Sequence, residues 1–340
     1  MKAIVFRKSK GLILEELPIP EIDKDQVLIK VSNTGFCGSD HSLVETEGTP
    51  DGIILGHEVS GRVVQLGSDV ENIEEGLKVI VRPTFCGLCW GCRIGRPQLC
   101  SNNRRSIGIG DLPGGFAEYV KVYPQMIIPV PDNVNSIDAA LAEAFAVALH
   151  AADLTGRKKG SVLIIGAGAI GLALVKILKI KGFAPIVVSE PVAAKRELAQ
   201  KFGADTVIDP MNSNLLMSGF ELTNGTGFEI VYECAGIPNL ISVAMNAVGA
   251  GGVVCQLSVI YQNISINPAI MTFKEISLLA SYGNTHEENK RCLQWMAEGK
   301  LDSRPLVSDL VLLEELPEIY QSRIQSGKAI KVMLQIGEEF

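Results

Sequence analysis

The sequence lacks a surplus of basic residues and any apolar run long enough to cross a membrane. Its 340 residues include 31 Lys and Arg against 38 Asp and Glu, a formal net charge of -7. Nucleic-acid binding depends on basic side chains that displace counterions from phosphates, so nucleic acid is not an expected partner. The longest nearly apolar run, Val162 to Val175, covers 14 residues and contains three glycines. Because a membrane span needs about 20 apolar residues, we expect no membrane contact.

The N-terminus also lacks the apolar core of a secretory signal, since Arg7, Lys8 and Lys10 follow its first apolar residues. Of the eight cysteines, four lie in one short segment and the other four are dispersed. In a chain without a secretory signal, this distribution favours metal binding over disulfides. We therefore expect a cytoplasmic protein. No tandem repeat or low-complexity segment is present.

The first 150 residues contain short strand-like segments separated by Gly and Pro, which is typical of an antiparallel or barrel-like β domain. A length of 340 residues accommodates about two domains. After the strand-like segments comes an Ala- and Leu-rich helix, with Ser136 as its expected N-cap. The predicted strands are Lys2–Phe6, Gln26–Asn33, Glu58–Gly67, Lys78–Pro83 and Phe116–Val122.

From Ser161 onward, apolar segments of strand length alternate with amphipathic helices, which predicts a parallel, doubly wound sheet. After Glu287 the sequence predicts one amphipathic helix, a second around Leu316 to Gln325, and a closing strand. The expected fold class is therefore α/β, with a β-rich domain beside a doubly wound parallel sheet. The predicted strands of that sheet are VLIIGAG, PIVVSEP, DTVID, FEIVYECAG and GGVVCQLS.

The four clustered cysteines follow the spacing Cys86-x2-Cys89-x2-Cys92-x7-Cys100. Four thiolates on a short loop can surround a tetrahedral Zn²⁺ completely, which leaves no coordination position for a substrate. Such a zinc is structural, because it orders a loop that has no core of its own. An iron–sulfur cluster also uses four cysteines, and a chance group of thiols is the remaining alternative.

Cys37, His57 and Glu58 form a second candidate metal site. A thiolate, an imidazole and a carboxylate can hold zinc with one position left open for a substrate. Spacing alone is weak support, because a single cysteine is more often part of a core and a single histidine is more often an ordinary polar residue.

A glycine motif, Gly166-Ala-Gly168-Ala-Ile170-Gly171, follows one predicted strand and opens a helix. Gly166 permits the tight turn, Gly168 lets a pyrophosphate approach the backbone, and Gly171 allows close packing of helix against strand. Ile170 completes the segment. A purely structural strand–helix turn is the alternative interpretation.

Glu190 lies 19 residues after the last glycine of this motif, at the end of the next strand. A carboxylate there would accept hydrogen bonds from the ribose hydroxyls of a dinucleotide, so the pair of features predicts dinucleotide binding. The same carboxylate would repel a 2′-phosphate, which favours NAD. Lys195 and Arg196 lie near Glu190 in the sequence and could bind a 2′-phosphate, so NADP is not excluded as the cofactor.

Together these features resemble the zinc-dependent medium-chain alcohol dehydrogenases over nearly the whole chain. The segment Gly56 to Val70 matches the family's Gly-His-Glu signature, and the four cysteines, GGFAEY at Gly114 to Tyr119 and the glycine motif follow in the family's order. The segment Ala142 to Ala151 is similar to that of the sorbitol, threonine and butanediol dehydrogenase branch.

The resemblance implies a GroES-like catalytic domain at residues 1–150, with a structural zinc lobe at about 84–104. It further implies a Rossmann NAD-binding domain at 151–285 and a return of the chain to the catalytic domain at 286–340, with the active site in the cleft. Two zinc ions per chain and NAD are the implied cofactors. The protein would be a homodimer or homotetramer, for which the apolar run Gly251 to Ile260 is the candidate interface.

The implied reaction transfers hydride from a secondary alcohol, such as a polyol, sugar alcohol or related hydroxy compound, to NAD⁺ and gives a ketone reversibly. The alternative substrate is a hydrophobic cyclic or allylic alcohol, and a non-catalytic nucleotide-binding relative is a third interpretation. The adjacent residues Arg104 and Arg105 could meet an acidic substrate, although solvated surface is the simpler expectation.

The resemblance assigns the catalytic zinc to Cys37 and His57, with Glu58 or Glu143 completing the ligand set, and a proton relay to Ser39. Two carboxylates and a thiolate would make the site net negative, so we expect only one carboxylate to bind tightly at a time. Glu58 is the expected ligand and Glu143 the nearby acceptor. His41 lies one position before the family's relay histidine, so no relay is assigned to it.

Overall fold

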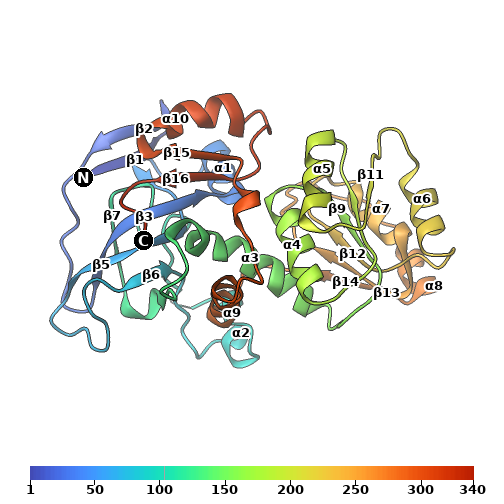
Figure 1. Cartoon of the computed structure of the whole chain (residues 1–340), viewed down its shortest axis with the longest axis horizontal. Helices are drawn as coiled ribbons and strands as arrows, with labels where there is room; N and C mark the ends of the chain where they lie inside the picture. The colour runs from blue at the N-terminus through green and yellow to red at the C-terminus, as the bar shows by residue number, and fades with distance from the viewer. Residues whose placement is uncertain (103) are drawn as a thin grey trace. The chain divides into compact units, whose positions relative to one another are not determined.

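The structure is a computed structural model that describes residues 1–102 and 104–340. Asn103, within the expected zinc lobe, lies outside the described residues. The chain divides into two compact units, one formed by Met1–Glu143 with Thr285–Phe340 and the other by Ala144–Asn284 (Figure 1). The boundary falls inside the long helix α3 (Ser136–Leu154). Among the described helices, none combines the length and apolarity that a membrane crossing requires.

The first unit is built on β-sheets. Over the described residues, a seven-stranded sheet has the order β15-β16-β3-β5-β6-β8, with β7 also paired to β3, and a smaller sheet has the order β2-β1-β4. Apart from the parallel pair β15–β16, neighbouring strands are antiparallel. The strands are β1 (Lys2–Arg7), β2 (Gly11–Glu16), β3 (Val27–Phe36), β4 (Ile53–Ile54), β5 (Glu58–Leu66), β6 (Lys78–Val81), β7 (Tyr119–Val122), β8 (Ile127–Pro129), β15 (Asp309–Leu312) and β16 (Val332–Gln335).

Short helices connect these strands, and α9 (His286–Ala297) returns the chain to the first unit. Alternating side chains of β3, β5 and β6 fill one apolar cluster with Met126, while β1 and β16 contribute to a second. β3 and β5 are neighbours in the interior of the larger sheet, and the candidate metal site lies where β3 ends and β5 begins. The remaining helices of this unit are α1 (Gly38–Glu45), α2 (Trp90–Arg93) and α10 (Leu316–Ile319).

The second unit is a six-stranded parallel sheet with the order β11-β10-β9-β12-β13-β14. Helices alternate with its strands, and α6, α7 and α8 share an apolar core with one face of the sheet. The elements are β9 (Val162–Ile165), α4 (Ala169–Ile180), β10 (Ile186–Ser189), α5 (Ala193–Phe202), β11 (Thr206–Ile208), α6 (Leu215–Leu222), β12 (Phe228–Glu233), α7 (Leu240–Ala247), β13 (Val248–Gln256), α8 (Pro268–Lys274) and β14 (Ser277–Ala280).

This parallel sheet, together with the β-rich unit, confirms the predicted α/β fold class. The short apolar strands of the sheet are buried on both faces, as in β9 and β10, where every residue is buried. Continuous apolar segments of this length, separated by helical periodicity, are what made the strands recognisable in the sequence.

One local prediction is wrong, and a second helix is present but changes its type along its length. Ser136 is not the N-cap of α3: the helix begins at Ser136, and the side chain of Asn135 accepts the Asp138 backbone N–H at 2.9 Å. The helix predicted from Leu316 to Gln325 is α-helical only as far as Ile319 and continues as a π-helix over Tyr320–Ile324. A π-turn does not alter the apolar pattern enough to be visible in the sequence.

Candidate functional site

The candidate metal site forms where β3 ends and β5 begins. These strands are antiparallel neighbours with Gly35 opposite Glu58, so Cys37, just after β3, lies at the same edge as His57, just before β5. Gly35 is required there, because a Cβ at this position would lie 1.9 Å from Glu58 Oε2. The register of two strands therefore brings together residues separated by about 20 positions.

The ligand atoms of Cys37, His57 and Glu58 all lie within 4.8 Å of one another. His57 and Glu58 are buried and Cys37 is partly buried. The structure thus brings together three of the four side chains predicted to hold the catalytic metal. Glu143, the fourth, is not in this group.

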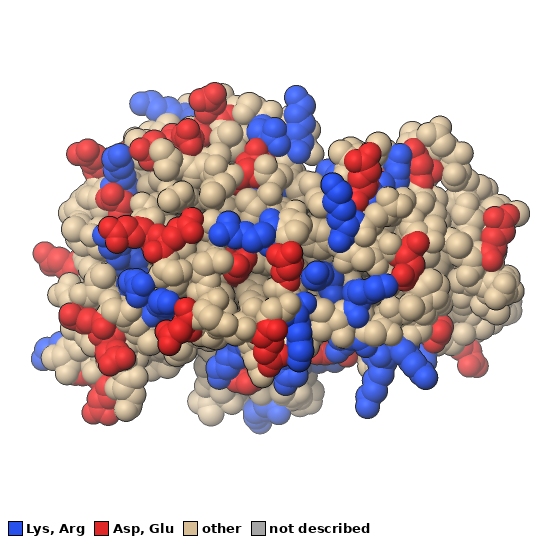
Figure 2. All heavy atoms as spheres, in the orientation of Figure 1, with Lys and Arg blue, Asp and Glu red and all other residues tan. Residues whose placement is uncertain are grey.

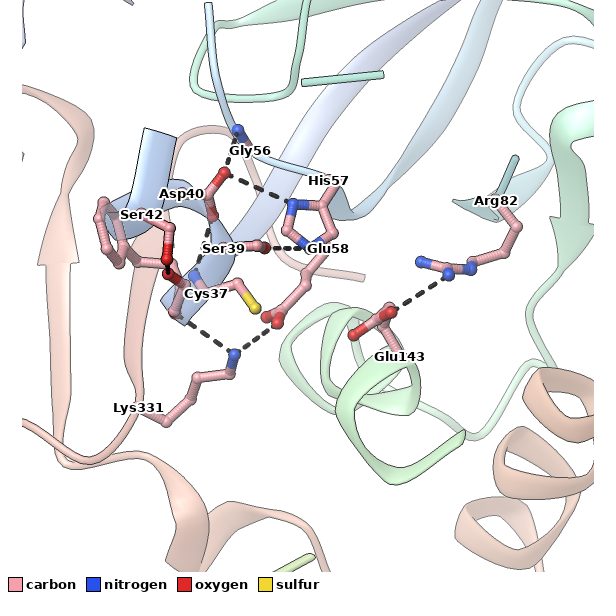
Figure 3. A network of polar contacts seen from close by, with 12 residues as sticks. Cys37, Ser39, Asp40, Ser42, Gly56, His57, Glu58, Arg82, Glu143 and Lys331 are labelled. Atoms are coloured by element: carbon pink, nitrogen blue, oxygen red, sulfur yellow. Dashed lines mark hydrogen bonds and ion pairs between the residues drawn. The ribbon is translucent and has the colours of Figure 1, made fainter. Parts of the chain in front are cut away.

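The imidazole of His57 is oriented by two neighbours from α1. Its Nδ1 lies 3.4 Å from Asp40 Oδ1, and its Nε2 lies 3.4 Å from Ser39 Oγ. The Asp40 carboxylate, fully buried, also accepts the backbone N–H groups of Cys37 at 2.9 Å and Gly56 at 3.1 Å. Burial opposes the charged form of His57, but the Asp40 carboxylate outweighs burial and raises the pKa of His57 well above its ordinary value. Figure 3 shows these contacts.

Glu58 has a buried cation as its partner. Lys331 Nζ, from the residue just before β16, lies 2.5 Å from Glu58 Oε1 and 3.3 Å from the Phe36 carbonyl oxygen. Burial lowers the pKa of Lys331, but the charges of Glu58 and Cys37 oppose it and the net shift is upward. The other oxygen, Glu58 Oε2, is buried and accepts no hydrogen bond from any described residue.

The donors present fit a zinc ion. A thiol, an imidazole and a carboxylate oxygen without a hydrogen bond lie within 4.8 Å of one another, and three protein ligands would leave one position open. Asp40 beside Nδ1 leaves Nε2 of His57 as the nitrogen available to a metal, the arrangement in which a carboxylate orients a ligating imidazole.

Glu143 is held by a different cation. Its Oε1 lies 3.1 Å from Arg82 Nη2, and both side chains are buried. Burial lowers the pKa of Arg82, and the negative charges of Glu143 and Glu58 act against that shift. The structure therefore places Glu143 in a buried ion pair and not among the clustered ligand atoms (Figure 3).

His41 does not join the cluster. Its Nδ1 lies 3.0 Å from the hydroxyl of Tyr320, which donates to Glu45 at 2.8 Å. His41 and Cys37 both line a cavity of about 190 Å³, whose other walls come from Phe36, Gly38 and the segment 324–332. The imidazole thus faces the C-terminal segment, in agreement with its displacement by one residue from the family's position.

The four lobe cysteines also come together, with their sulfur atoms within 4.8 Å of one another. The sulfur of Cys92 is 3.5 Å from that of Cys89 and 3.9 Å from that of Cys86. Tetrahedral zinc with bonds of about 2.3 Å requires separations of about 3.8 Å, so the spacing suits that metal. Backbone N–H groups of Cys92 and Ser101 lower the pKa of Cys89 to about 6. Backbone N–H groups also lower the pKa of Cys86, whereas burial and the neighbouring thiols raise the pKa of Cys92 to about 12. Cys86 and Cys89 are therefore the two thiols most readily converted to thiolates.

In the second unit, each glycine of the predicted motif occupies a position that suits its expected task. Gly166 has φ +100°, in the region that favours glycine. A Cβ on Gly171 would lie 2.0 Å from the Gly166 carbonyl oxygen, so the helix approaches the turn too closely for a side chain. A Cβ on Gly168, the N-cap of α4, would have no atom within 4 Å, which leaves room beside the helix N-terminus. Ile170 lies in the first turn of that helix.

Glu190 follows β10 and is buried against the glycine turn. Its carboxylate accepts the backbone N–H groups of Ala167 at 2.8 Å and Val192 at 3.0 Å. Arg196 is engaged by the carbonyl oxygens of residues 190 and 191 and by Asp209 at 2.9 Å. Lys195, on the first turn of α5, is partly exposed. Of the two nearby cations, Lys195 is therefore the one that forms no ion pair among those observed over the described residues.

Three residues of the first site were not identified from the sequence: Asp40, Arg82 and Lys331. Asp40 lies three positions after Cys37 and forms a capping box with it, so an acidic residue at that spacing is a pattern that could have been found. Arg82 and Lys331 lie 61 and 273 positions from their partners, and no local pattern links such pairs.

Comparisons with known proteins agree with this geometry. Residues 23–132 match the family model described as "Alcohol dehydrogenase GroES-like domain", and residues 169–298 match "Zinc-binding dehydrogenase". The chain is 31% identical to sorbitol dehydrogenase of Bacillus subtilis (strain 168) over 98% of this chain and 97% of that protein. It is 33% identical to L-threonine 3-dehydrogenase of Pyrococcus horikoshii over 98% of this chain and 99% of that protein.

Solved structures extend the comparison to three dimensions. The crystal structure of 2R,3R-butanediol dehydrogenase from Bacillus subtilis has a TM-score of 0.88 and 27% identity, covering 98% of this chain and 99% of that chain. A Sinorhizobium meliloti 1021 protein crystallised with NADP has a TM-score of 0.90 and 32% identity, covering 98% of both chains. The fold is thus that of a nicotinamide-dependent dehydrogenase. The chain belongs to the zinc-dependent medium-chain alcohol dehydrogenase family, which confirms the resemblance seen in its sequence.

Proposed function

We propose that the protein oxidises a secondary alcohol to a ketone by hydride transfer to NAD⁺, reversibly. The substrate class is a polyol, sugar alcohol or related hydroxy compound, as the names of the similar sorbitol and butanediol dehydrogenases suggest. The observation that carries the proposal is the convergence of Cys37, His57 and Glu58 within 4.8 Å, a three-donor set suited to a catalytic zinc.

Cys37, His57 and Glu58 would hold the catalytic zinc, which supplies a Lewis acid that lowers the pKa of a substrate hydroxyl. Asp40 keeps the His57 ring in place through its contact with Nδ1. Ser39 Oγ lies 3.4 Å from His57 Nε2. Its hydroxyl would relay the proton of the substrate, accepting that proton while it gives up its own toward the ribose and solvent.

The glycine turn and Glu190 would bind the dinucleotide. The open space at Gly168 and the N-terminus of α4 suit a pyrophosphate, and the Ile170 backbone lies in the same first turn. Glu190 has lone pairs beyond the two that accept backbone N–H groups, and these would accept the ribose hydroxyls. Its negative charge favours NAD over NADP, with Lys195 as the nearby cation.

The four lobe cysteines, Cys86, Cys89, Cys92 and Cys100, would hold a structural zinc. Support comes from sulfur separations of 3.5 and 3.9 Å. Because all four positions are filled by protein, this metal would take no part in the reaction.

A homodimer or homotetramer is the proposed assembly. The apolar run Gly251 to Ile260 is not itself an edge, because β13 pairs with β12 on one side and β14 on the other. β14 is the outermost described strand of that sheet, and its free edge supports pairing with a second copy. Light scattering should give a multiple of the 36.5 kDa chain mass. A monomer mass at micromolar concentration would exclude the assembly.

The proposed function is tested by a screen of zinc-loaded protein against polyols, hydroxy acids and cyclic alcohols, each with NAD and with NADP. Reduction of NAD by acyclic secondary alcohols is the expected result. Turnover of cyclic or allylic alcohols alone would favour the alternative substrate class. The absence of turnover with every alcohol, in protein that contains both zincs, would contradict the function.

A further inference from the structure

Each of the two carboxylates that could ligate the catalytic metal has its own buried cation. Glu58 is paired with Lys331 at 2.5 Å, and their side chains are 1% and 3% exposed. Glu143 is paired with Arg82 at 3.1 Å, and their side chains are 10% and 7% exposed. Figure 3 shows both ion pairs. A carboxylate that binds the metal must therefore break its ion pair with Lys331 or Arg82, or must contact the metal and that cation at the same time.

The two pairs form one electrostatic network. Arg82 feels the charge of Glu58 as well as that of its partner, and Lys331 feels the charge of Glu143 as well as that of its own. Glu143 therefore lies within electrostatic reach of the metal cluster, although its oxygens are not among the clustered ligand atoms.

The position of Glu143 is fixed from both sides. The residue lies in the eighth position of α3 (Ser136–Leu154), so its Cα belongs to a long helix. Arg82 directly follows β6, and its backbone N–H donates to the Met126 carbonyl oxygen at 2.7 Å. The guanidinium is thus presented from an anchored backbone. A planar, permanently charged guanidinium is suited to fixing a carboxylate in one place.

We propose that Arg82 is a positioning residue that holds the Glu143 carboxylate beside the catalytic metal but off it. This inference rests on the proposed function. With Glu143 restrained, the metal has Cys37, His57 and Glu58 as protein ligands and keeps its fourth position open. With Glu143 released, the carboxylate fills that position and competes with the substrate hydroxyl.

The test uses the full-length protein with Co²⁺ in both metal sites and without nucleotide or alcohol. Visible absorption reports the number and kind of ligands around Co²⁺, and competition with a chelator reports how tightly the catalytic metal is held. The variants are Arg82→Gln, Glu143→Gln and the double variant. Arg105→Gln is the matched control, because Arg105 pairs with the half-exposed Asp111 of the same unit. The lobe metal contributes equally to every sample.

Arg82→Gln should change the cobalt spectrum, because the Glu143 carboxylate replaces solvent in the fourth position. It should also tighten binding of the catalytic metal by about tenfold, because a charged ligand is gained and a competing cation is lost. Glu143→Gln and the double variant should both keep the wild-type spectrum, and so should Arg105→Gln. A wild-type spectrum for folded Arg82→Gln would overturn the proposal. So would a changed spectrum that persists in the double variant.

Arg82→Gln removes one partner of a buried ion pair, and the variant can fail to fold. Glu143→Gln then decides the matter, because it removes the charge: an altered spectrum would mean that Glu143 already ligates the metal in the wild type, which contradicts the proposal. A failure of the proposed function is distinguishable, since it would appear as wild-type protein with a normal cobalt spectrum and no alcohol oxidation.

Discussion

At the scale of single residues, a few side chains position the proposed metal ligands without being ligands themselves. Asp40 is the clearest of them. Its carboxylate is fully buried and contacts the His57 ring while it also accepts two backbone N–H groups. Partners of this kind fix the orientation and tautomer of a ligating imidazole.

Asp40→Asn should therefore weaken binding of the catalytic zinc by about 10- to 100-fold while leaving the lobe zinc in place. The amide can still accept one backbone N–H, so the helix should form. Zinc retention under competition with a chelator measures the effect. Asp51→Asn, at a largely exposed carboxylate of the same unit, is the control and should behave as wild type. Equal retention in both variants would show that Asp40 does not position His57.

Glu190 makes a second prediction at this scale. Glu190→Ser should lower the ratio of catalytic efficiencies for NAD and NADP, because both the ribose acceptor and the repulsion of a 2′-phosphate are lost. The variant also loses the acceptor for the Ala167 and Val192 N–H groups, so its stability should fall by about 1 to 3 kcal/mol. Steady-state kinetics with both cofactors measures the ratio. An unchanged ratio, or a wild type that prefers NADP, would contradict the assignment.

The limits of sequence reasoning are visible in these same residues. The glycine motif was predictable because its glycines meet local requirements of the turn. Gly166 has a positive φ, and a Cβ on Gly171 would lie 2.0 Å from a backbone oxygen. Cys37, His57 and Glu58 came from a family resemblance, since spacing alone could not show that two strands would align them. Lys331 was not predictable, because a buried cation opposite Glu58 depends on the pairing of β16 with β3, far apart in the chain.

At the scale of elements, two glycines of the turn between β9 and α4 have different roles: Gly171 serves packing and Gly168 serves the proposed binding of NAD. Gly171→Ala places a Cβ against the Gly166 carbonyl oxygen and should destabilise the protein by about 1 to 3 kcal/mol. Gly168→Ala meets no protein atom within 4 Å, so it should unfold like wild type but bind NAD more weakly. Thermal unfolding and calorimetric titration with NAD distinguish the two. Normal NAD affinity in Gly168→Ala would argue against a pyrophosphate at this turn.

The lobe that carries Cys86 to Cys100 has little apolar core, and two of its large apolar side chains, Leu88 and Trp90, are more than 70% exposed. Its order should therefore depend on metal. Cys92→Ser should leave one zinc per chain and lower the stability by several kcal/mol. Cys255→Ala, at a buried cysteine outside both clusters, should keep both zincs. The assignment of a structural zinc to the lobe would be contradicted if the wild type contained one zinc per chain and Cys92→Ser had the melting temperature of the wild type.

At the scale of the whole molecule, the exposed charges and the buried charges contribute differently. Acidic and basic side chains are interspersed over the face shown in Figure 2, and exposed pairs such as Lys179 with Asp205 lie at 2.8 Å. Such pairs contribute little to stability. The charges that matter to the proposed chemistry are the buried ones beside the cluster, Lys331 and Arg82, each held against a carboxylate.

The central claim is that a metal held by Cys37, His57 and Glu58 supports direct hydride transfer from an alcohol carbon to NAD⁺. The most direct measurement offers the zinc-loaded protein a secondary alcohol deuterated at the carbinol carbon and determines the mass of the reduced nicotinamide formed. The account predicts that the wild type transfers one deuterium to the nicotinamide, and that Cys37→Ser, with its lobe zinc retained, forms no reduced cofactor. Reduced nicotinamide without deuterium, or turnover by Cys37→Ser at the wild-type rate, would contradict it.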